Sequence, residues 1–404
     1  MDQITRPYVL YTPVNKNDKK PLIVFLHGSI SSPKLKTNPL DYAQTNKFNA
    51  IIEQQEYYIL YPFGQQGATW FDRVGVDMIF GEIKEVIKNN NIDENKIFLA
   101  GFSDGASGTF YFSMTYPELF AGFIPLNGTY GVADKLGEYA IFPENTNQKS
   151  MFVVNTQSDM LYPSRITRPM IEHLKKFNPN IIYHEPEGGH DMGFVNFLKT
   201  DIQSFINSNK KQNLQSIVWE SSQIGQINIA PYINVIEIDT AASRKSWHTQ
   251  NTYILHNDKA DLGIIFNNNY RGKGLQIEQF KYPNSTAERI GLEKGDVLIA
   301  FEQDTIRSKF SPMAYTLRKK AEDYLEVTFI RNGENKILKG NFNKATTTLI
   351  FDEDKSYKIK SRIEGNSIYI ETSRIKIVDV DFKNKELRNI KHLYINNKKQ
   401  KIKI

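Results

Sequence analysis

The stretch "IFLAGFSDGASGTFYFSMTY", residues 97–116, decides the fold of the first half of the chain. An apolar run that reads as a buried strand leads into Gly101-Phe102-Ser103-Asp104-Gly105, and a helical pattern follows. This is G-x-S-x-G between a strand and a helix, where glycines allow a sharp turn with unfavourable serine backbone angles. The start of the helix also offers unpaired N–H groups to a developing oxyanion. The alternative is an ordinary helix N-cap, so the motif needs partners.

Short apolar runs alternate with amphipathic stretches up to about residue 209. Helical stripes occupy residues 77–90 and 194–209. Six apolar runs are continuous, as in the strands of a parallel sheet that is covered on both faces: 21–28, 57–62, 96–101, 123–128, 151–156 and 181–186. This alternation predicts a doubly wound α/β domain over residues 1–209, with functional groups at the carboxyl ends of its strands.

The partners of the serine follow in the order that this fold requires. Asp159 follows a predicted strand in "MFVVNTQSDMLYP", and His190 follows the next one in "IIYHEPEGGHDMG". A histidine takes the serine proton and a carboxylate holds its tautomer, in the chain order Ser, Asp, His. Upstream, "HGS" ends a strand, where the backbone N–H of Ser29 could join that of Asp104 in an oxyanion hole. The sequence therefore predicts a nucleophilic serine site.

Several nearby residues have two interpretations. Trp70, in "GATWFDR", could line the substrate cleft or lie in the core. Asp104 and Asp191 could replace Asp159 as the acid, but each adjoins another member of the site and would point elsewhere. His27 is expected to shape the oxyanion loop through a hydrogen bond. The chain has no Cys and no cluster with metal-ligand spacing, so no metal and no other cofactor is expected.

Residues 1–209 resemble a compact α/β-hydrolase of the esterase type, which includes polyhydroxybutyrate-depolymerase-like and feruloyl-esterase-like enzymes. The residues that carry the resemblance are "HGS", "GFSDGA", "SDMLYP" and "GGH". It implies a serine carboxylic-ester hydrolase with an acyl-enzyme intermediate: Ser103 as nucleophile, His190 as general base, Asp159 as orienting acid, and backbone N–H groups near Ser29 and Asp104 as oxyanion donors. No long cap insertion precedes the acid, which favours an open site for a bulky or polymeric ester, such as a polyester or a polysaccharide ester.

The sequence pattern becomes mostly strand-like after a polar joint, "KKQNL" (210–214). We expect this joint to be a boundary that few contacts cross. Segments 210–257 and 344–404 are β-rich. Their apolar and polar residues alternate with a period of two, which indicates antiparallel strands with one solvent-exposed face. We expect these two segments to pair into one sandwich, with Trp219 and Trp247 as core anchors.

Residues 258–343, between the two β-rich segments, resemble a PDZ domain. The resemblance is carried by "LGIIF", "GLQI", "STAERIGLEKGDVLIAFEQDTI" and "EVTFIRNG". It implies that the backbone N–H groups of Leu262, Gly263 and Ile264 bind the C-terminal carboxylate of a peptide. Asp261 precedes them, and its charge is unhelpful for binding another carboxylate. The alternative is a module that only packs or orients.

Composition narrows the function classes further. The net charge of the 404-residue chain is +6, from lysines scattered among Asn and Ile, and no compact basic patch interleaved with aromatics supports nucleic-acid binding. The start, "MDQITRPYVLYTP", shows no secretory signal; a periplasmic or secreted location is favoured if a signal was trimmed, and otherwise a cytoplasmic one. Two rival functions stay open: a serine peptidase of the prolyl-oligopeptidase type, and a non-catalytic peptide- or glycan-binding protein on a hydrolase scaffold. The oligomeric state is not indicated.

Overall fold

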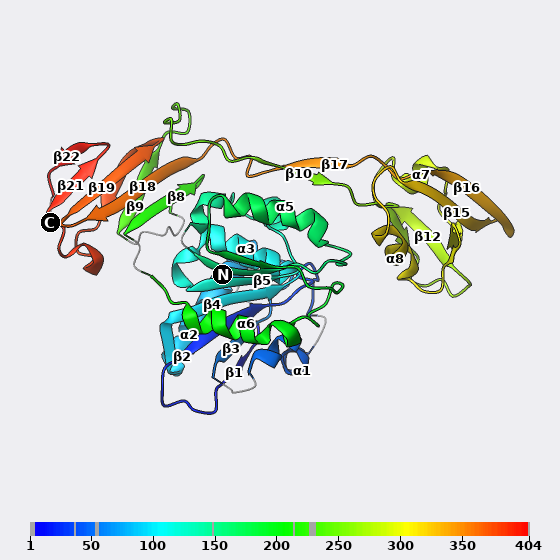
Figure 1. The fold of residues 1–404 in the computed structure, drawn as a ribbon, viewed down its shortest axis with the longest axis horizontal. Helices are drawn as coiled ribbons and strands as arrows, with labels where there is room; N and C mark the ends of the chain where they lie inside the picture. The colour runs from blue at the N-terminus through cyan, green and yellow to red at the C-terminus, as the bar shows by residue number, and fades with distance from the viewer. Residues whose placement is uncertain are drawn as a thin grey trace. The chain divides into compact units, whose positions relative to one another are not determined.

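The computed structural model describes residues 5–35, 38–52, 56–147, 149–212, 215–225 and 232–402. The chain divides into two compact units, one formed by Met1–Tyr253 with Ile350–Ile404 and the other by Ile254–Leu349 (Figure 1). Residues 213–214 of the predicted joint lie outside the described part of the chain. Within the described ranges, no helix is both long and apolar enough to cross a membrane.

The first unit is built on a seven-stranded sheet in the order β1-β3-β2-β4-β5-β6-β7. All six predicted strands are present and parallel to one another, which confirms the doubly wound α/β architecture. The strand that sequence reasoning missed is β1, a four-residue, half-buried edge strand antiparallel to β3. The strands are β1 (Tyr8–Tyr11), β2 (Lys20–Leu26), β3 (Tyr58–Pro62), β4 (Ile92–Phe102), β5 (Gly122–Leu126), β6 (Ser150–Val154) and β7 (Ile181–His184).

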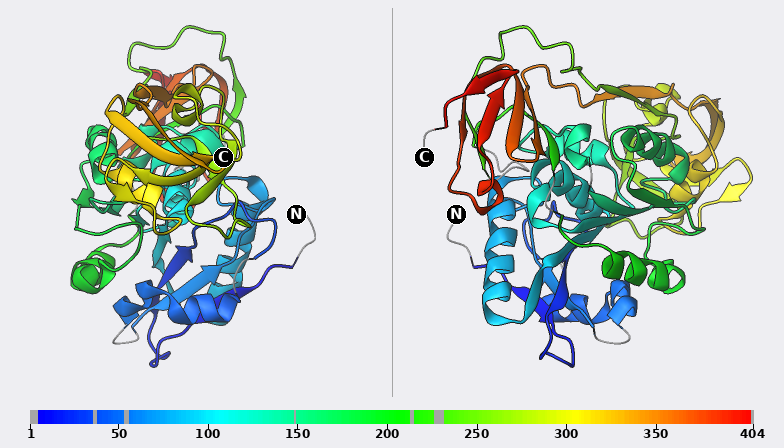
Figure 2. Two further views of the ribbon diagram at one scale, coloured as in Figure 1. Left: turned by 90° about the vertical axis from the view of Figure 1, so that its right-hand side faces the viewer. Right: turned by 60° about the vertical axis from the view of Figure 1, so that its left-hand side comes forward.

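Helices cover both faces of this sheet (Figures 1 and 2). One face packs its alternate β2 residues, Ile23 and Phe25, against η1 and α6. On the other face α3 lies so close to β2 that a Cβ at Gly105 would be 2.0 Å from the carbonyl oxygen of Leu26. The helices are α1 (Pro39–Thr45), η1 (Lys47–Ile52), α2 (Arg73–Asn89), α3 (Asp104–Thr115), η2 (Pro117–Leu119), α4 (Tyr130–Leu136), η3 (Pro143–Thr146), α5 (Ser164–Lys175) and α6 (Val195–Ser208).

Helix α2 begins earlier than the apolar stripe at 77–90 suggests. Its N-cap is Asp72, whose Oδ1 accepts a hydrogen bond from the N–H of Gly75 at 2.9 Å. A carboxylate cap satisfies one of the N–H groups that a helix start leaves unpaired. The cap therefore fixes the start, and the expectation of a helix from residue 77 is wrong at that end.

The β-rich segments on either side of the second unit form one packed region of the first unit. A five-stranded sheet runs in the order β22-β21-β19-β18-β8, and β20 pairs with β9. All pairs are antiparallel except β19 with β21, which is parallel. The elements are β8 (Ser216–Ser221), β9 (Ile233–Ile238), β18 (Tyr357–Glu364), β19 (Ser367–Ser373), β20 (Ile375–Val380), η4 (Lys385–Leu387), β21 (His392–Ile395) and β22 (Lys398–Gln400).

The two tryptophans expected in the core of this β region have different environments. Trp219 on β8 is fully buried and packs in one cluster with residues of β9, β18 and β19. Trp247 is only half-buried, and the Nζ atom of Lys360 lies 4.7 Å from the centroid of its ring. The expectation that Trp247 anchors the core is therefore wrong, because a cation–π contact at the surface occupies its ring instead.

The β region packs directly on the α/β domain. The N–H of Glu220 in β8 donates to Asn145 Oδ1 in η3, and Asn145 Nδ2 donates to the carbonyl oxygen of Glu220, both at 2.8 Å. The ring of Phe351 stacks on Tyr130 of α4 with centroids 5.0 Å apart. The expectation that few contacts cross the boundary at 210–214 is therefore wrong: β8 and Phe351 supply buried partners to the α/β domain.

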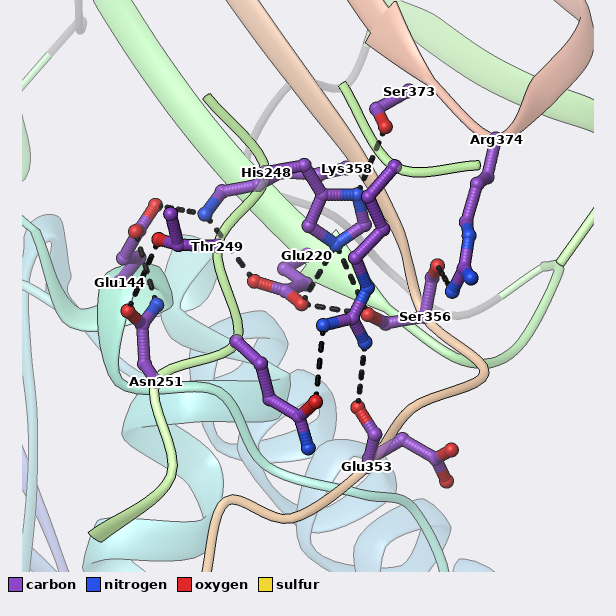
Figure 3. Close-up of polar contacts among 12 residues, drawn as sticks. Glu144, Glu220, His248, Thr249, Asn251, Glu353, Ser356, Lys358, Ser373 and Arg374 are labelled. Carbon is purple, nitrogen blue, oxygen red and sulfur yellow. Dashed lines mark hydrogen bonds and ion pairs between the residues drawn. The ribbon is translucent and has the colours of Figure 1, made fainter. Parts of the chain in front are cut away.

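Buried charges lie beside this interface (Figure 3). Lys358 Nζ is 2.5 Å from Glu144 Oε2 and 3.4 Å from Glu220 Oε2. His248 Nε2 lies 3.1 Å from Glu220 Oε1, and the hydroxyl of Ser356 donates to the same oxygen at 2.7 Å. Burial alone would raise the pKa of the Glu220 carboxyl, but the His248 hydrogen bond and the Lys358 charge hold this pKa below its usual range. The partners thus keep a buried carboxylate ionised.

The second unit, Ile254–Leu349, has its own apolar core. Its main sheet runs in the order β11-β12-β13-β15-β16, with β14 paired to β13, and β10 pairs with β17 where the chain enters and leaves the unit. The elements are β10 (Tyr253–Asn257), β11 (Ile264–Phe266), β12 (Leu275–Phe280), α7 (Thr286–Arg289), β13 (Val297–Phe301), β14 (Asp304–Thr305), α8 (Ser311–Leu317), β15 (Tyr324–Arg331), β16 (Glu334–Asn341) and β17 (Thr346–Ile350).

Candidate active site

Ser103 occupies a strained turn between β4 and α3. Its backbone has φ 59° and ψ −120°, which L-residues rarely adopt. A Cβ at Gly101 would stand 2.3 Å from the carbonyl oxygen of Gly105, so the tight turn requires a glycine at 101. The Ser103 side chain makes no capping hydrogen bond to α3. The arrangement therefore differs from an ordinary N-cap, and the hydroxyl is directed elsewhere.

The structure brings Ser103, His190 and Asp159 into one chain of hydrogen bonds. His190 Nδ1 lies 2.7 Å from Asp159 Oδ2, and His190 Nε2 lies 2.9 Å from Ser103 Oγ. An ionised carboxylate can only accept, so Nδ1 carries the proton and Nε2 accepts from the serine hydroxyl. Asp159 is completely buried, and its other oxygen accepts from the N–H groups of Leu161 and Tyr162 at 2.7 and 2.9 Å. The carboxylate is thus fixed from both sides.

Two aromatic residues flank the imidazole of His190. The ring of Phe102 lies 4.9 Å from it, between centroids, and that of Tyr162 lies 5.8 Å away. Burial and the charges of Asp104 and Asp159 raise the pKa of the Tyr162 phenol to about 12. Tyr162 therefore stays neutral at physiological pH.

The predicted oxyanion loop lies against the serine turn. Ser29 has a positive φ of 59°, and the N–H of the next residue, Ile30, donates to Asp104 Oδ2 at 3.0 Å. This bond ties the loop to the start of α3, where the Asp104 N–H is one of the amides without an intrahelical acceptor. A Cβ at Gly28 would be 3.0 Å from the Cβ of Ser103, so Gly28 permits the close approach. Ser29 and Asp104 thus belong to two connected segments beside the nucleophile.

Trp70 does not line a cleft. It has no exposed surface, and its Nε1–H donates to the carbonyl oxygen of His27 at 2.9 Å. His27 is enclosed by the rings of Tyr42, Phe63 and Trp70. The two ring nitrogens of His27 face the carbonyl oxygens of Gly28 at 2.7 Å and Gly64 at 3.1 Å, and burial lowers the pKa of the ring. The substrate-lining interpretation of Trp70 is wrong. The buried side chain instead packs against His27, beside the predicted oxyanion loop.

A pocket of about 200 Å³ opens beside this loop. It begins next to the serine, because a Cβ at Gly28, one of its lining residues, would be 3.5 Å from Ser103 Oγ. Three mainly apolar side chains line it, those of Leu35, Tyr42 and Phe63, and Lys34 is its charged member. None of Ser103, His190 and Asp159 contributes to its lining. The pocket is therefore on the oxyanion-loop side of the nucleophile.

The rival acids point away from His190. Asp191 is exposed, and its Oδ1 accepts from the N–H of Gly193 at 2.6 Å and lies 3.4 Å from Lys47 Nζ. The Asp104 carboxylate is engaged by Ile30, as described above. Among the described residues, no group of three or more His, Cys, Asp or Glu side chains is arranged to hold a metal ion.

The predicted carboxylate loop of the second unit has an internal partner. The N–H of Gly263 donates to Asp261 Oδ1 at 3.0 Å, and Asp261 Oδ2 accepts from the hydroxyl of Tyr282 at 2.9 Å. A peptide carboxylate would have to displace Asp261 from Gly263. Leu262 and Ile264 flank this glycine, and Ile264 begins the edge strand β11.

Sequence reasoning missed one residue beneath the site. Asn127 follows β5 with a φ of 52° and is fully buried among the loops that carry Asp159 and His190. Its signal in the sequence is an Asn-Gly pair directly after a buried strand, a combination that marks left-handed backbone. That signal predicts a turn but not the contacts of the side chain.

We expect Asp159→Asn to lower kcat for ester hydrolysis by about 10²- to 10⁴-fold, because the amide cannot hold His190 in the tautomer that accepts the serine proton. The matched control is Asp191→Asn, which changes the neighbouring exposed carboxylate and should leave kcat near the wild-type value. Circular dichroism should be unchanged in both variants. Full activity of Asp159→Asn would mean that another carboxylate orients the histidine.

Comparison with known proteins finds relatives for the first half of the chain. Residues 12–210 match the phospholipase/carboxylesterase family model. The chain is 28% identical over 131 residues to poly(3-hydroxyalkanoate) depolymerase C of Paucimonas lemoignei, covering 29% of this chain and 30% of that protein. It is also 28% identical over 126 residues to the bifunctional acetylxylan esterase/xylanase XynS20E of Neocallimastix patriciarum, covering 30% of this chain and 17% of that protein. The chain thus spans less than a third of the length of these relatives.

Solved structures with a similar fold include FphF, a fluorophosphonate-binding serine hydrolase of Staphylococcus aureus. It has 16% identity and a TM-score of 0.41, with 50% of this chain and 93% of that chain covered. Est1E of Butyrivibrio proteoclasticus with bound ferulic acid has 12% identity and a TM-score of 0.39, with 51% and 96% covered. Residues 12–210 thus form a doubly wound α/β domain that matches the phospholipase/carboxylesterase family model.

Proposed function

We propose that the protein is a serine carboxylic-ester hydrolase that works through an acyl-enzyme intermediate. The observation that carries the proposal is the chain of hydrogen bonds from Ser103 Oγ to His190 Nε2 (2.9 Å) and from His190 Nδ1 to Asp159 Oδ2 (2.7 Å). The strained turn at Ser103 supports it, because nucleophilic attack requires a pre-oriented hydroxyl. The family match of residues 12–210 supports an enzyme of this class.

The reaction follows from this arrangement. Ser103 Oγ attacks the ester carbonyl carbon while His190 takes the hydroxyl proton, and the carbonyl oxygen becomes an oxyanion. We assign the backbone N–H groups of Ser29 and Asp104 as its donors. His190 then gives the proton to the departing alcohol. A water molecule attacks the acyl-serine by the same route, which releases the acid and restores Ser103. Asp159 stabilises the imidazolium in each step.

The pocket beside the oxyanion loop indicates a short acyl group. Because His190 must protonate the leaving alcohol, the alcohol part of the ester lies toward His190. The pocket is lined from the loop side and not by His190, so it receives the acyl part. Its 200 Å³ is below the range of about 300–1,000 Å³ that is usual for sites of drug-sized ligands. The names of the two relatives, an acetylxylan esterase and a polyhydroxyalkanoate depolymerase, agree with a short acyl ester of a polymer.

The test of the proposed function is a fluorophosphonate labelling experiment joined to a substrate panel. We expect stoichiometric labelling on Ser103 and turnover of short-chain chromogenic esters, with faster hydrolysis of acetyl and butyryl esters than of long-chain ones. A peptide-anilide panel run in parallel tests the prolyl-oligopeptidase type of activity. An unlabelled protein without ester turnover would favour the non-catalytic scaffold instead.

Leu35→Ala should widen the acyl pocket, since Leu35 is one of its three mainly apolar lining residues. We expect the ratio of kcat/KM for an acyl chain two methylenes longer to that for acetyl to rise about 10-fold. Leu161→Ala is the control, because Leu161 is a partly exposed leucine of the acid loop that does not line the pocket. An unchanged acyl-length profile in Leu35→Ala would contradict the assignment of the pocket.

For the second unit we propose only a binding role that rests on the PDZ resemblance. Strand β11 stands at the edge of its sheet, where an extended segment could add as a further strand. The Asp261–Gly263 hydrogen bond disfavours capture of a chain-terminal carboxylate. An internal segment is therefore a better ligand for this edge than a free C-terminus.

A further inference from the structure

Asn127 lies where three loops of the α/β sheet meet. Its backbone N–H donates to the carbonyl oxygen of Val154 at 2.8 Å, which carries the β5–β6 pairing one residue past the end of β5. Its φ of 52° then turns the chain sharply toward Gly128. Asn tolerates this left-handed conformation better than most residues. The side chain is thereby held at the carboxyl edge of the sheet, without exposure to solvent.

The amide group of Asn127 bridges the acid loop and the histidine loop. Its Oδ1 accepts from the N–H of Thr156 at 2.9 Å, which fixes the orientation of the amide because that N–H needs an acceptor. Its Nδ2 then faces the carbonyl oxygens of Gly189 at 3.2 Å and Asp191 at 3.3 Å. These two residues are the neighbours of His190 on either side. One side chain thus holds the backbone before and after the proposed base.

Thr156, in the loop that carries Asp159, also bonds to the loop that carries His190. Its hydroxyl donates to the carbonyl oxygen of Gly189 at 2.8 Å. Its backbone carbonyl accepts from the N–H of Asp159 at 3.5 Å and from that of Ser164 at 3.3 Å. The N–H of Ser158 also donates to the carbonyl oxygen of Gly188 at 3.0 Å. The loops that carry the acid and the base are therefore linked to each other through Thr156 and Asn127.

We propose that Asn127 is a positioning residue of the esterase site, which sets the distance from His190 Nε2 to Ser103 Oγ by clamping both peptide groups beside His190. The inference rests on the proposed function. The side chain of Asn127 bonds to Thr156 and to the backbone of Gly189 and Asp191, so it acts through the His190 loop. A misplacement of about 1 Å at a reacting group can cost about 10²-fold in rate.

The decisive variant is Asn127→Asp, which keeps the shape and the acceptor for Thr156 N–H but loses the paired donors to Gly189 and Asp191. We expect kcat on a short-chain ester to fall by about 10- to 100-fold with little change in KM. The low-field proton resonance of the His190–Asp159 hydrogen bond should broaden or disappear. A merely structural residue would lower the melting temperature without changing this resonance in the folded protein.

Asn155→Asp is the matched control. Asn155 is equally buried at the same sheet edge, but its Nδ2 donates to the carbonyl oxygen of Gly128 at 3.1 Å and not to the His190 loop. Asn155→Asp also introduces a buried carboxyl group, so its stability should fall. Its kcat should nevertheless stay near that of the wild type, because the His190 loop keeps its contacts. An equal loss of kcat in both variants would overturn the proposal, as would an unchanged kcat in Asn127→Asp.

A second pair of variants decides the question if Asn127→Asp does not fold. Thr156→Val removes the hydroxyl that donates to Gly189 and keeps the backbone N–H, whereas Thr156→Ser keeps both. We expect the valine variant to lose kcat and the serine variant to retain it; equal kcat in the two would overturn the proposal. Ser103→Ala separates the two levels of inference. If it remains active, the proposed function fails, whereas an inactive Ser103→Ala beside a fully active Asn127→Asp refutes the clamp alone.

Discussion

Ser103→Ala should lower kcat for ester hydrolysis by a factor on the order of 10⁴ to 10⁶ and leave the fold intact. The substitution removes the hydroxyl oxygen that lies 2.9 Å from His190 Nε2. The serine hydroxyl makes no capping bond, so α3 loses no helix cap. Alanine must still accept a φ of 59°, which costs it no more than it costs serine. The loss is therefore chemical rather than structural.

Ser113→Ala is the control for this experiment. Ser113 is a buried serine farther along α3 whose hydroxyl donates to the carbonyl oxygen of Phe110 at 2.8 Å. Removing it should leave kcat unchanged. Fluorophosphonate labelling should be lost in Ser103→Ala and retained in Ser113→Ala. Near-wild-type hydrolysis by Ser103→Ala would refute the esterase proposal, because no acyl-enzyme could then form at residue 103.

The molecule contains a second Ser–His–carboxylate arrangement. It shows that hydrogen-bond distances alone do not identify a catalytic site, because the serine must also be accessible to a substrate. His248 Nδ1 lies 2.9 Å from Ser373 Oγ, and its Nε2 lies 3.1 Å from Glu220 Oε1. Ser373, His248 and Glu220 are nevertheless 1%, 2% and 3% exposed, so no substrate can reach the hydroxyl. Ser103 is also rather buried, at 9%, but a pocket opens beside it. We therefore propose catalysis for the Ser103 arrangement and a structural role for the buried one.

The residues that sequence could predict are those whose chemistry follows from local pattern and chain order. Ser103, Asp159 and His190 each follow an apolar strand, and parallel strands bring their carboxyl ends to one edge of a sheet. Asn127 could not be predicted, since its contacts depend on how the loops after β6 and β7 fold over β5. Trp70 was ambiguous because a large aromatic beside the site can face either the cleft or the core.

The same distinction explains the β region. Period-two alternation predicts strands, but it does not say what their buried polar residues meet. Glu220 and Lys358 lie on strands and are fully buried. From the sequence pattern alone, both charged residues would be expected on the solvent-exposed face of the sheet. Lys358 also pairs with Glu144, which lies in η3 of the α/β domain, 214 positions earlier in the chain. Docking of this kind depends on long-range pairing and could not be predicted from the sequence.

This docking leads to the last prediction: a fragment that ends at residue 209 should not fold to the native α/β domain, whereas excision of Ile254–Leu349 should be tolerated. Truncation leaves Asn145 without Glu220, although Asn145 is buried in the intact unit. It also removes Lys358 from Glu144 and the ring of Phe351 from Tyr130. The truncation thus uncovers the buried Asn145 and Tyr130 together, and an ordinary domain has a stability of only about 5–15 kcal/mol with which to tolerate such losses.

Excision is the matched comparison, because it removes more residues than any single β segment and yet breaks none of these contacts. The second unit has its own core, and the chain enters and leaves it through the paired strands β10 and β17, so a short Gly/Ser linker can replace it. We expect the excised protein to unfold cooperatively and to hydrolyse a short-chain ester at a rate close to that of the full chain. The 1–209 fragment should be insoluble or lack a cooperative transition. If that fragment instead proves soluble and fully active, the β region is an appendage, and the buried Glu144–Lys358–Glu220 group does not support the catalytic domain.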